Sequence, residues 1–153
     1  MSTVAHLNWG TLVAPWEDPA VAEFVNNVGR VNDAAERSPG FVWRKPNDEM
    51  DAEYNALEGL GPLDRLAATL SVWESAADLD TFVMRTIHGR FLARRENWFE
   101  PSNGPSHVVW PIEDRHRPTL NEARARVDRM IANGPTQDAY NLAWWREHSE
   151  QAA

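Results

Sequence analysis

The first predicted strand places an imidazole and an amide on the same side of the chain. Residues 4–12 alternate, so that Ala5, Leu7 and Trp9 point one way while His6 and Asn8 point the other. Histidine can act as a general base near neutral pH, and asparagine or arginine can stabilise an enolate or phenolate oxygen. His6 and Asn8 are therefore candidate catalytic residues for proton abstraction from an activated phenol or enol.

Other predicted strands add residues to the same face of the sheet as His6 and Asn8. Residues 66–73 also alternate, with Thr69, Ser71 and Trp73 on one face and an aliphatic face made of Leu66, Ala68, Leu70 and Val72. If the aliphatic face packs on the helices, the other face joins His6 and Asn8 as the wall of a cavity on the side away from the helices. An aromatic wall with a few hydrogen-bonding groups is typical of a small-molecule site. The candidate substrate-binding residues on the strands are Ser71, Trp73, His107 and, according to the register of strand 41–44, Trp43 or Arg44.

A third candidate catalytic residue, His88, lies at the expected end of a helix, directly before Gly89. There it could interact favourably with the helix dipole as a cation, which is a structural role, or reach the cavity as an acid or base. Arg95 follows two helical turns later and would share a face with His88 in a continuous helix, which makes it a further candidate substrate-binding residue. The alternative for Arg95 is an ion pair with a carboxylate such as Glu74 or Glu96.

Structural explanations stand beside these functional ones. His6 could be a sheet-surface histidine covered by a partner subunit, Asn8 a buried amide, and Trp73 a packing residue. A functional and a structural role therefore remain open for each of the three.

Composition excludes several chemistries. Among 153 residues there is no cysteine, so thiolate nucleophiles, disulfides and zinc–thiolate sites are impossible. The formal charge of -8 argues against nucleic-acid binding. The sequence has no HExxH motif, glycine-rich phosphate loop or GxSxG motif, and we expect no metal site. With no signal peptide or membrane-spanning run, we expect no membrane association and a cytoplasmic protein.

The order of elements predicts an α+β fold. Strands at 4–12, 41–44, 66–73 and 106–112 alternate with helices that begin after Asp18 and Ser75, both plausible N-caps. This order indicates a ferredoxin-like antiparallel sheet with helices on one face. An extra helix begins at Thr119, and the spacing of Tyr140, Leu142 and Trp144 then predicts a short strand or extended arm. We expect a single domain over residues 1–145 and a polar, frayed tail over residues 146–153.

Two further features concern how the sheet is covered: the long connection between two strands, and the sheet face away from the helices. The connection over residues 45–62 is acidic and lacks periodicity, so it either covers a site or interface or is a solvated insertion. The sheet face away from the helices would be costly to leave in water, and a second subunit or a folded-over tail would cover it. We expect a homodimer.

Several segments resemble one bacterial family, the domain of unknown function 3291. They are SPGFVWR at 38–44, LSVWES at 70–75, and the downstream pattern Phe82, His88, Arg95, Trp98 and Phe99. Thr11, where a basic residue is expected, and the long acidic connection depart from the pattern. The family is similar to the dimeric α+β barrel superfamily, which includes antibiotic-biosynthesis monooxygenases, muconolactone isomerases and several haem enzymes.

This resemblance implies three alternatives for function. The first is a cofactor-independent monooxygenase, isomerase or cyclase that acts on an aromatic or polyketide-like small molecule. The second is a haem-binding barrel protein with His88 as the iron ligand, as a histidine is in related haem barrels. The third is a non-catalytic ligand-binding module or dimeric structural module.

Overall fold

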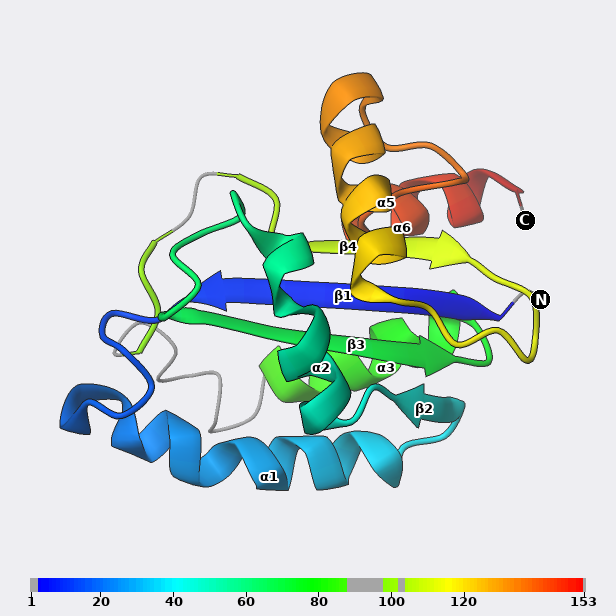
Figure 1. Cartoon of the computed structure of the whole chain (residues 1–153). Helices are drawn as coiled ribbons and strands as arrows, with labels where there is room; N and C mark the ends of the chain where they lie inside the picture. Colours follow the sequence, from blue (N-terminus) through cyan, green and yellow to red (C-terminus); the bar gives the residue numbers. More distant parts are fainter. Residues whose placement is uncertain (1–2, 88–97, 102–103, 153) are drawn as a thin grey trace.

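A four-stranded antiparallel sheet forms the centre of the molecule (Figure 1). The computed structural model describes residues 3–87, 98–101 and 104–152. The strands are β1 (Val4–Thr11), β2 (Phe41–Arg44), β3 (Leu66–Trp73) and β4 (His107–Pro111), in the order β2-β3-β1-β4. Because crossover connections join β1 to β2 and β3 to β4, this order is the predicted ferredoxin-like arrangement, and the α+β fold is confirmed.

The two crossover helices begin at the predicted caps. Asp18 accepts a hydrogen bond from the backbone N–H of Ala20 and starts the 3-10 turn η1 (Pro19–Val21), which leads into α1 (Ala22–Glu36). The Ser75 hydroxyl accepts a hydrogen bond from the N–H of Asp78 at 3.1 Å and starts α3 (Ala76–Ile87). These short polar side chains satisfy N–H groups that lack a partner within the helix.

The crossover helices pack on the face opposite to the one predicted. Ala35 of α1 and Leu79 of α3 lie in one buried cluster with Val4, Trp73 and Val109, which share a sheet face with His6. The prediction that the aliphatic face would receive these helices was therefore wrong. Alternation indicates which side chains share a face, but the handedness of the crossover decides which face the helix covers.

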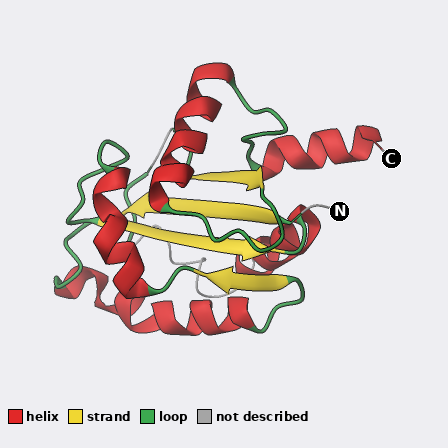
Figure 2. Ribbon diagram, turned by 45° about the vertical axis from the view of Figure 1, so that its right-hand side comes forward, coloured by secondary structure: helices red, strands yellow, loops and turns green. Residues whose placement is uncertain are grey.

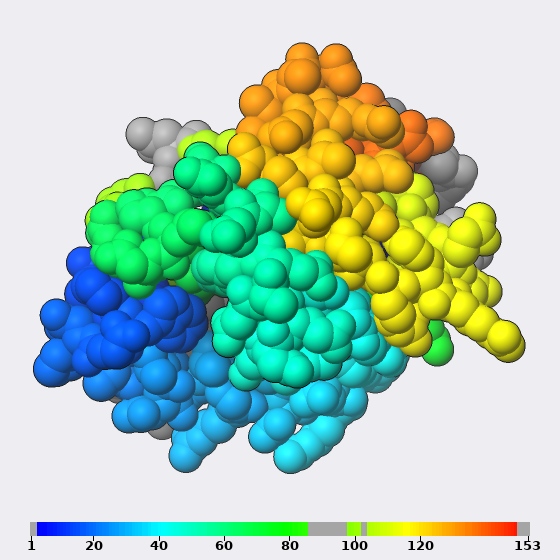
Figure 3. Space-filling view, viewed as in Figure 1, coloured from blue at the N-terminus to red at the C-terminus, as the bar shows by residue number. Residues whose placement is uncertain are grey.

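The aliphatic face is covered by other helices of the same chain. The connection after β2 forms α2 (Asn47–Glu53) and the 3-10 turn η2 (Tyr54–Leu57), and α5 (Leu120–Asn133) follows β4. Figure 3 shows these segments spread over the sheet on this side. The largest buried cluster of the described residues joins them to the strands through Leu7, Leu70, Val72, Val108, Trp110, Met50, Leu57, Leu120, Ala123 and Val127.

This cover removes the argument that predicted a homodimer. The acidic connection is a structured cover, and helices of the described chain lie on both faces of the sheet rather than on one (Figure 2). Of the two ways to cover an apolar face, the chain uses its own folded-over elements. The homodimer stays a prediction.

One buried ion pair joins the cover to the sheet. Lys45, directly after β2, is only 4% exposed, and its Nζ lies 2.8 Å from Glu53 Oε2 of α2. The other carboxylate oxygen of Glu53 accepts a hydrogen bond from the backbone N–H of Leu120 at 2.8 Å, at the start of α5. One carboxylate therefore holds α2, the end of β2 and the start of α5 together.

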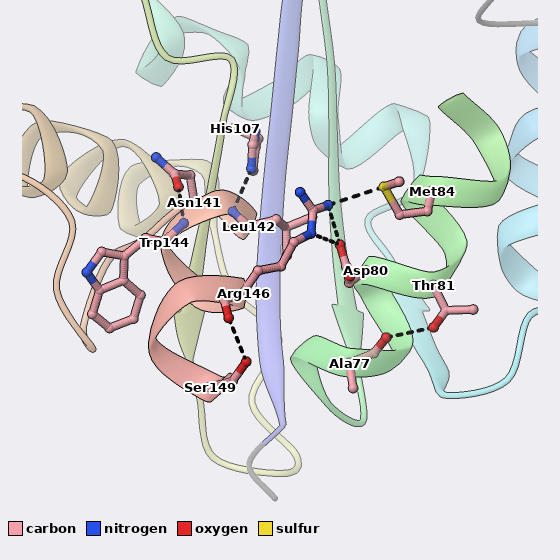
Figure 4. Close-up of polar contacts among 10 residues, drawn as sticks. All are labelled: Ala77, Asp80, Thr81, Met84, His107, Asn141, Leu142, Trp144, Arg146 and Ser149. Atoms are coloured by element: carbon pink, nitrogen blue, oxygen red, sulfur yellow. Dashed lines mark hydrogen bonds and ion pairs between the residues drawn. The ribbon is translucent and has the colours of Figure 1, made fainter. Parts of the chain in front are cut away.

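The predicted C-terminal arm is instead a helix, α6 (Leu142–Ala152). Asn141 Oδ1 accepts a hydrogen bond from the N–H of Trp144 at 2.8 Å, so Asn141 is its N-cap. Figure 4 shows Arg146 of α6 reaching Asp80 of α3, with Nε lying 3.0 Å from Oδ1. The alternation of Tyr140, Leu142 and Trp144 was therefore misleading, because an Asn cap before Leu142 starts a helix.

Candidate functional site

A cavity of about 910 Å³ lies between the sheet and the crossover helices and continues around the edge of β3. Its floor is the sheet face that carries His6, Ser71 and Trp73, and α1 and α3 contribute to its other walls. Its lining is rich in aromatic side chains, which are Trp9, Trp16, Phe24, Phe41, Tyr54, Trp73, Phe82 and Phe99. The cavity therefore lies on the helix side of the sheet, whereas the sequence predicted it on the side away from the helices.

His6 is buried in the floor of this cavity. Its side chain is 5% exposed, and its cross-strand neighbours are Ser71 on β3 and Val109 on β4. No group of the described chain makes a hydrogen bond to its ring. Burial, together with the nearby His107, lowers the pKa of His6 to about 3, so the ring is neutral at neutral pH.

His107 already has a structural partner. Its Nε2 accepts a hydrogen bond from the backbone N–H of Leu142 at 3.1 Å, at the start of α6 (Figure 4). The neutral ring therefore carries its proton on Nδ1. Burial and the positive charge of Arg146 lower the pKa of His107, and its ring centroid lies 5.7 Å from that of His6. His107 lines the cavity, but it also positions α6.

Arg44 lies in one row across the sheet with Ser71 and His6, and it adds a positive charge to that row. It is the partner of Ser71 in the β2–β3 ladder, and Ser71 is the partner of His6 in the β3–β1 ladder, so the three side chains share one face. Arg44 Nε is buried without a hydrogen-bond partner, and Nη1 makes one long contact of 3.4 Å with Asn47 Oδ1. The row thus contains an imidazole, a hydroxyl and a guanidinium next to one another.

Ser71 and Trp73 line the cavity from the same sheet face as His6. The indole N–H of Trp73 donates a hydrogen bond to Ser71 Oγ at 3.0 Å, which leaves the hydroxyl hydrogen of Ser71 available to an acceptor. Trp73 is 1% exposed and stacks on Phe82, with ring centroids 5.2 Å apart. Trp73 therefore packs in the core and also shapes the cavity.

Asn8 lies at the exposed part of the cavity. It pairs with Thr69 on β3 and His107 on β4, and it follows His6 by two residues on the same face of β1. Its side chain is exposed and lines the cavity. The alternative of a buried amide was therefore wrong for Asn8.

Trp43 is outside the cavity, which corrects one predicted substrate-binding residue. It pairs with Val72 and so lies on the aliphatic face, where Lys45 Nζ is 5.6 Å and Arg117 Cζ 5.7 Å from its ring centroid. A register shift between Phe41 and Trp43 sets this orientation and turns Arg44 toward the cavity instead. The sequence left this choice open because a short strand does not reveal its register.

His88 and Arg95 lie outside the described residues. Their predicted roles, including haem ligation by His88, stay predictions. Among the residues that the structure describes, no group of three or more histidine, aspartate or glutamate side chains is arranged to hold a metal ion. No helix in the described part of the chain is both long enough and apolar enough to cross a bilayer.

Sequence reasoning missed the part of the lining that comes from α1 and from the connection. Asn32 lines the cavity between Val28 and Ala35, two apolar members of the same helix face. A polar side chain four residues after Val28, within an apolar stripe, was the available signal. Tyr54 was not predictable in this way, because the connection has no periodicity.

Comparison with known proteins assigns the chain to a family. The model of the family described as Domain of unknown function (DUF3291) matches residues 3–153, so the chain belongs to this family, as the sequence motifs predicted. A comparison with curated proteins found no significant match.

Two solved structures are similar to the chain. Both are of SnoaB, a cofactor-independent oxygenase from Streptomyces nogalater, and one is an asparagine-to-alanine mutant. The first is 16% identical, covers 74% of this chain and 96% of its own, and has a TM-score of 0.44. The mutant is 16% identical, covers 76% and 97%, and has a TM-score of 0.46. Similarity at this level does not indicate an activity.

Proposed function

We propose that this protein is an enzyme that acts on an aromatic or polyketide-like small molecule without a bound cofactor, with proton transfer to His6 as its first step. The observation that carries this proposal is the state of His6. It is a buried imidazole at the floor of an aromatic-lined cavity, without a hydrogen bond to any group of the described chain.

Stability alone does not account for such a side chain. Burial disfavours a polar imidazole that has no hydrogen bond to the described chain, whereas an apolar residue of similar size would add favourable packing. A ligand hydroxyl or an activated C–H group in the cavity would give the imidazole its partner. The cost is thus consistent with a residue retained for binding or catalysis.

The charges around His6 support proton abstraction from a neutral substrate. Because its pKa is lowered to about 3, His6 is already deprotonated at neutral pH and can accept a proton. At this pKa the imidazole is a weak base. An enolate or phenolate formed beside it would raise its pKa, because the opposite charge stabilises the imidazolium. The Ser71 hydroxyl in the same row would stabilise the oxyanion by donating a hydrogen bond.

The enolate or phenolate is an intermediate common to three reactions. Reprotonation at another atom gives isomerisation, and attack on a carbonyl of the same molecule gives cyclisation. Reaction with O2 at a carbon that carries two hydrogens gives a ketone: one oxygen atom enters the substrate, and the other leaves as water with those two hydrogens, so the substrate itself is the reductant. Oxygen consumption measured with an electrode separates the third reaction from the first two.

The test is hydrogen–deuterium exchange of the acidic C1 protons of 2-tetralone, a bicyclic aromatic ketone, followed by NMR in D2O. The wild-type protein should accelerate exchange, and His6→Gln should lower that acceleration about 100-fold, since general base catalysis contributes 10² to 10⁴. His148→Gln is the matched control, because His148 is exposed on α6 and does not line the cavity.

Exchange that persists unchanged in a folded His6→Gln variant would contradict the catalytic role of His6. Binding of 2-tetralone without accelerated exchange in the wild type would favour the non-catalytic ligand-binding alternative.

A further inference from the structure

Arg44 is a cation without an ion-pair partner among the described residues. The protein has 23 acidic side chains, yet none that the structure describes forms an ion pair with this guanidinium. Its Nε is buried and unpaired, although an arginine offers a fork of donors suited to a carboxylate. A buried donor of this kind, lining a cavity, indicates a ligand that completes it.

The other charged groups that line the cavity are already neutralised or are acidic. Lys45 Nζ is paired with Glu53, and Glu100 is paired with Arg65. Asp51 also lines the cavity, and its charge acts on Tyr54. Within the described lining, Arg44 is therefore the cationic side chain left for an anionic ligand group.

The position of Arg44 defines where that group would lie. Arg44, Ser71 and His6 follow one another across three neighbouring strands, so the backbones of β2 and β1 are about 10 Å apart in this row. The long side chain of Arg44 reaches across part of this distance, and aromatic side chains line the cavity. A molecule of one or two rings with an acidic substituent at one end would reach both Arg44 and His6.

We propose that the substrates are aromatic acids, whose carboxylate binds Arg44 while the reacting group lies at His6. This inference rests on the proposed function, because it names the substrate class of the same cavity. Ser71 lies between the two and would donate its hydroxyl hydrogen to the carboxylate or to the oxyanion that forms. The arginine thus positions the molecule, and the histidine reacts with it.

The experiment compares a charged and an uncharged probe of nearly equal shape, 2-naphthoate and 2-naphthamide. Their dissociation constants are measured by isothermal titration calorimetry. The wild type should bind 2-naphthoate about tenfold or more tightly than the amide, the size expected for a hydrogen-bonded charge pair. Arg44→Met should abolish this preference and leave binding of 2-naphthamide within about twofold.

Two variants control for side effects. Arg129→Met removes the same charge from an exposed position of α5 that does not line the cavity, and it should keep the preference. Arg44→Lys keeps the charge but loses the planar fork, so it should retain only part of the preference. It also gives a folded comparison if Arg44→Met is unstable.

Equal binding of the two probes by the wild type, or a preference that survives in Arg44→Met, would overturn the inference. If 2-tetralone exchange still depends on His6 in that case, the proposed function stands and only the substrate class fails. Absence of binding by both probes, together with absence of exchange, would overturn both proposals.

Discussion

The two faces of the sheet serve different purposes, although the same four strands form both. One face is aliphatic and aromatic, with Leu7, Leu70 and Trp110 fully buried under α2, η2 and α5. The other carries His6 and Ser71, which are buried polar side chains, and it borders a cavity of about 910 Å³. The first face removes apolar area from water, whereas the second combines a smaller buried cluster with polar side chains that line a cavity.

The difference shows how a small domain can combine a stable core with a cavity that is lined by polar side chains. Burial of apolar area stabilises a fold by about 25 cal/mol per Å². The aliphatic face provides such burial in one connected cluster, which joins three strands to helices from two separate parts of the chain. The cavity face can then hold an imidazole and a guanidinium at some cost in stability.

The largest effect should come from the covered face. Leu70→Ala removes a fully buried side chain and should lower the free energy of unfolding by about 2–5 kcal/mol. Thr69→Ala, the adjacent residue on the cavity face, should change it by less than about 1 kcal/mol. Urea unfolding followed by circular dichroism measures both. Equal losses in the two variants would contradict the division of roles between the faces.

A smaller effect of opposite sign is expected at His6. His6→Leu should raise the free energy of unfolding at pH 7 by about 1 kcal/mol, because it replaces a buried polar imidazole by an apolar side chain. The gain should grow as the pH falls. The pKa of His6 is about 3 in the folded protein and 6.5 in an unfolded chain, so the unfolded state binds more protons between these values.

The wild type therefore loses stability as the pH falls below 6.5, by an amount on the order of 2–3 kcal/mol at pH 4.5 from this residue. His107 contributes with the same sign in both proteins, because its pKa is also lowered. Urea unfolding at pH 7, 5.5 and 4.5 measures the difference. Parallel pH profiles for wild type and His6→Leu would show that His6 is not buried in its neutral form.

An effect smaller than the one expected for His6 at acid pH concerns Glu53, which links α2 to the end of β2 and the start of α5. Glu53→Gln leaves Lys45 without its nearest carboxylate and should lower the free energy of unfolding at pH 7 by about 1–2 kcal/mol. Burial alone would raise the pKa of Glu53, but the hydrogen bonds from Lys45 and Leu120 and the charge of Lys45 lower it below the ordinary 4.5.

The stability that ionised Glu53 contributes is thus present above pH 4.5 and is lost as the pH falls through its lower folded value. The gap between wild type and Glu53→Gln should narrow over that range. Glu49→Gln is the control, because Glu49 Oε1 lies 3.8 Å from Lys45 Nζ and is exposed. A gap that does not change with pH would mean that Glu53 acts through packing rather than charge.

Local sequence signals predicted most of the elements. The ranges 41–44 and 66–73 match β2 and β3, and the caps at Asp18, Ser75 and Thr119 start the helices as expected. These signals depend on residues close in sequence: side-chain alternation in a strand, and a polar oxygen that accepts a hydrogen bond from the next helical N–H groups. Asn141 carried the same type of signal and was overlooked in favour of alternation.

The sequence by itself determined which side chains share a face of the sheet, so His6, Asn8, Ser71, Trp73 and His107 were grouped correctly. Only the tertiary structure decided which face the crossover helices cover, which residue of strand 41–44 enters the cavity, and that the chain covers its own aliphatic face. The physical reason is range: alternation is set by neighbouring residues, whereas crossover handedness, strand register and helix docking depend on contacts between distant segments.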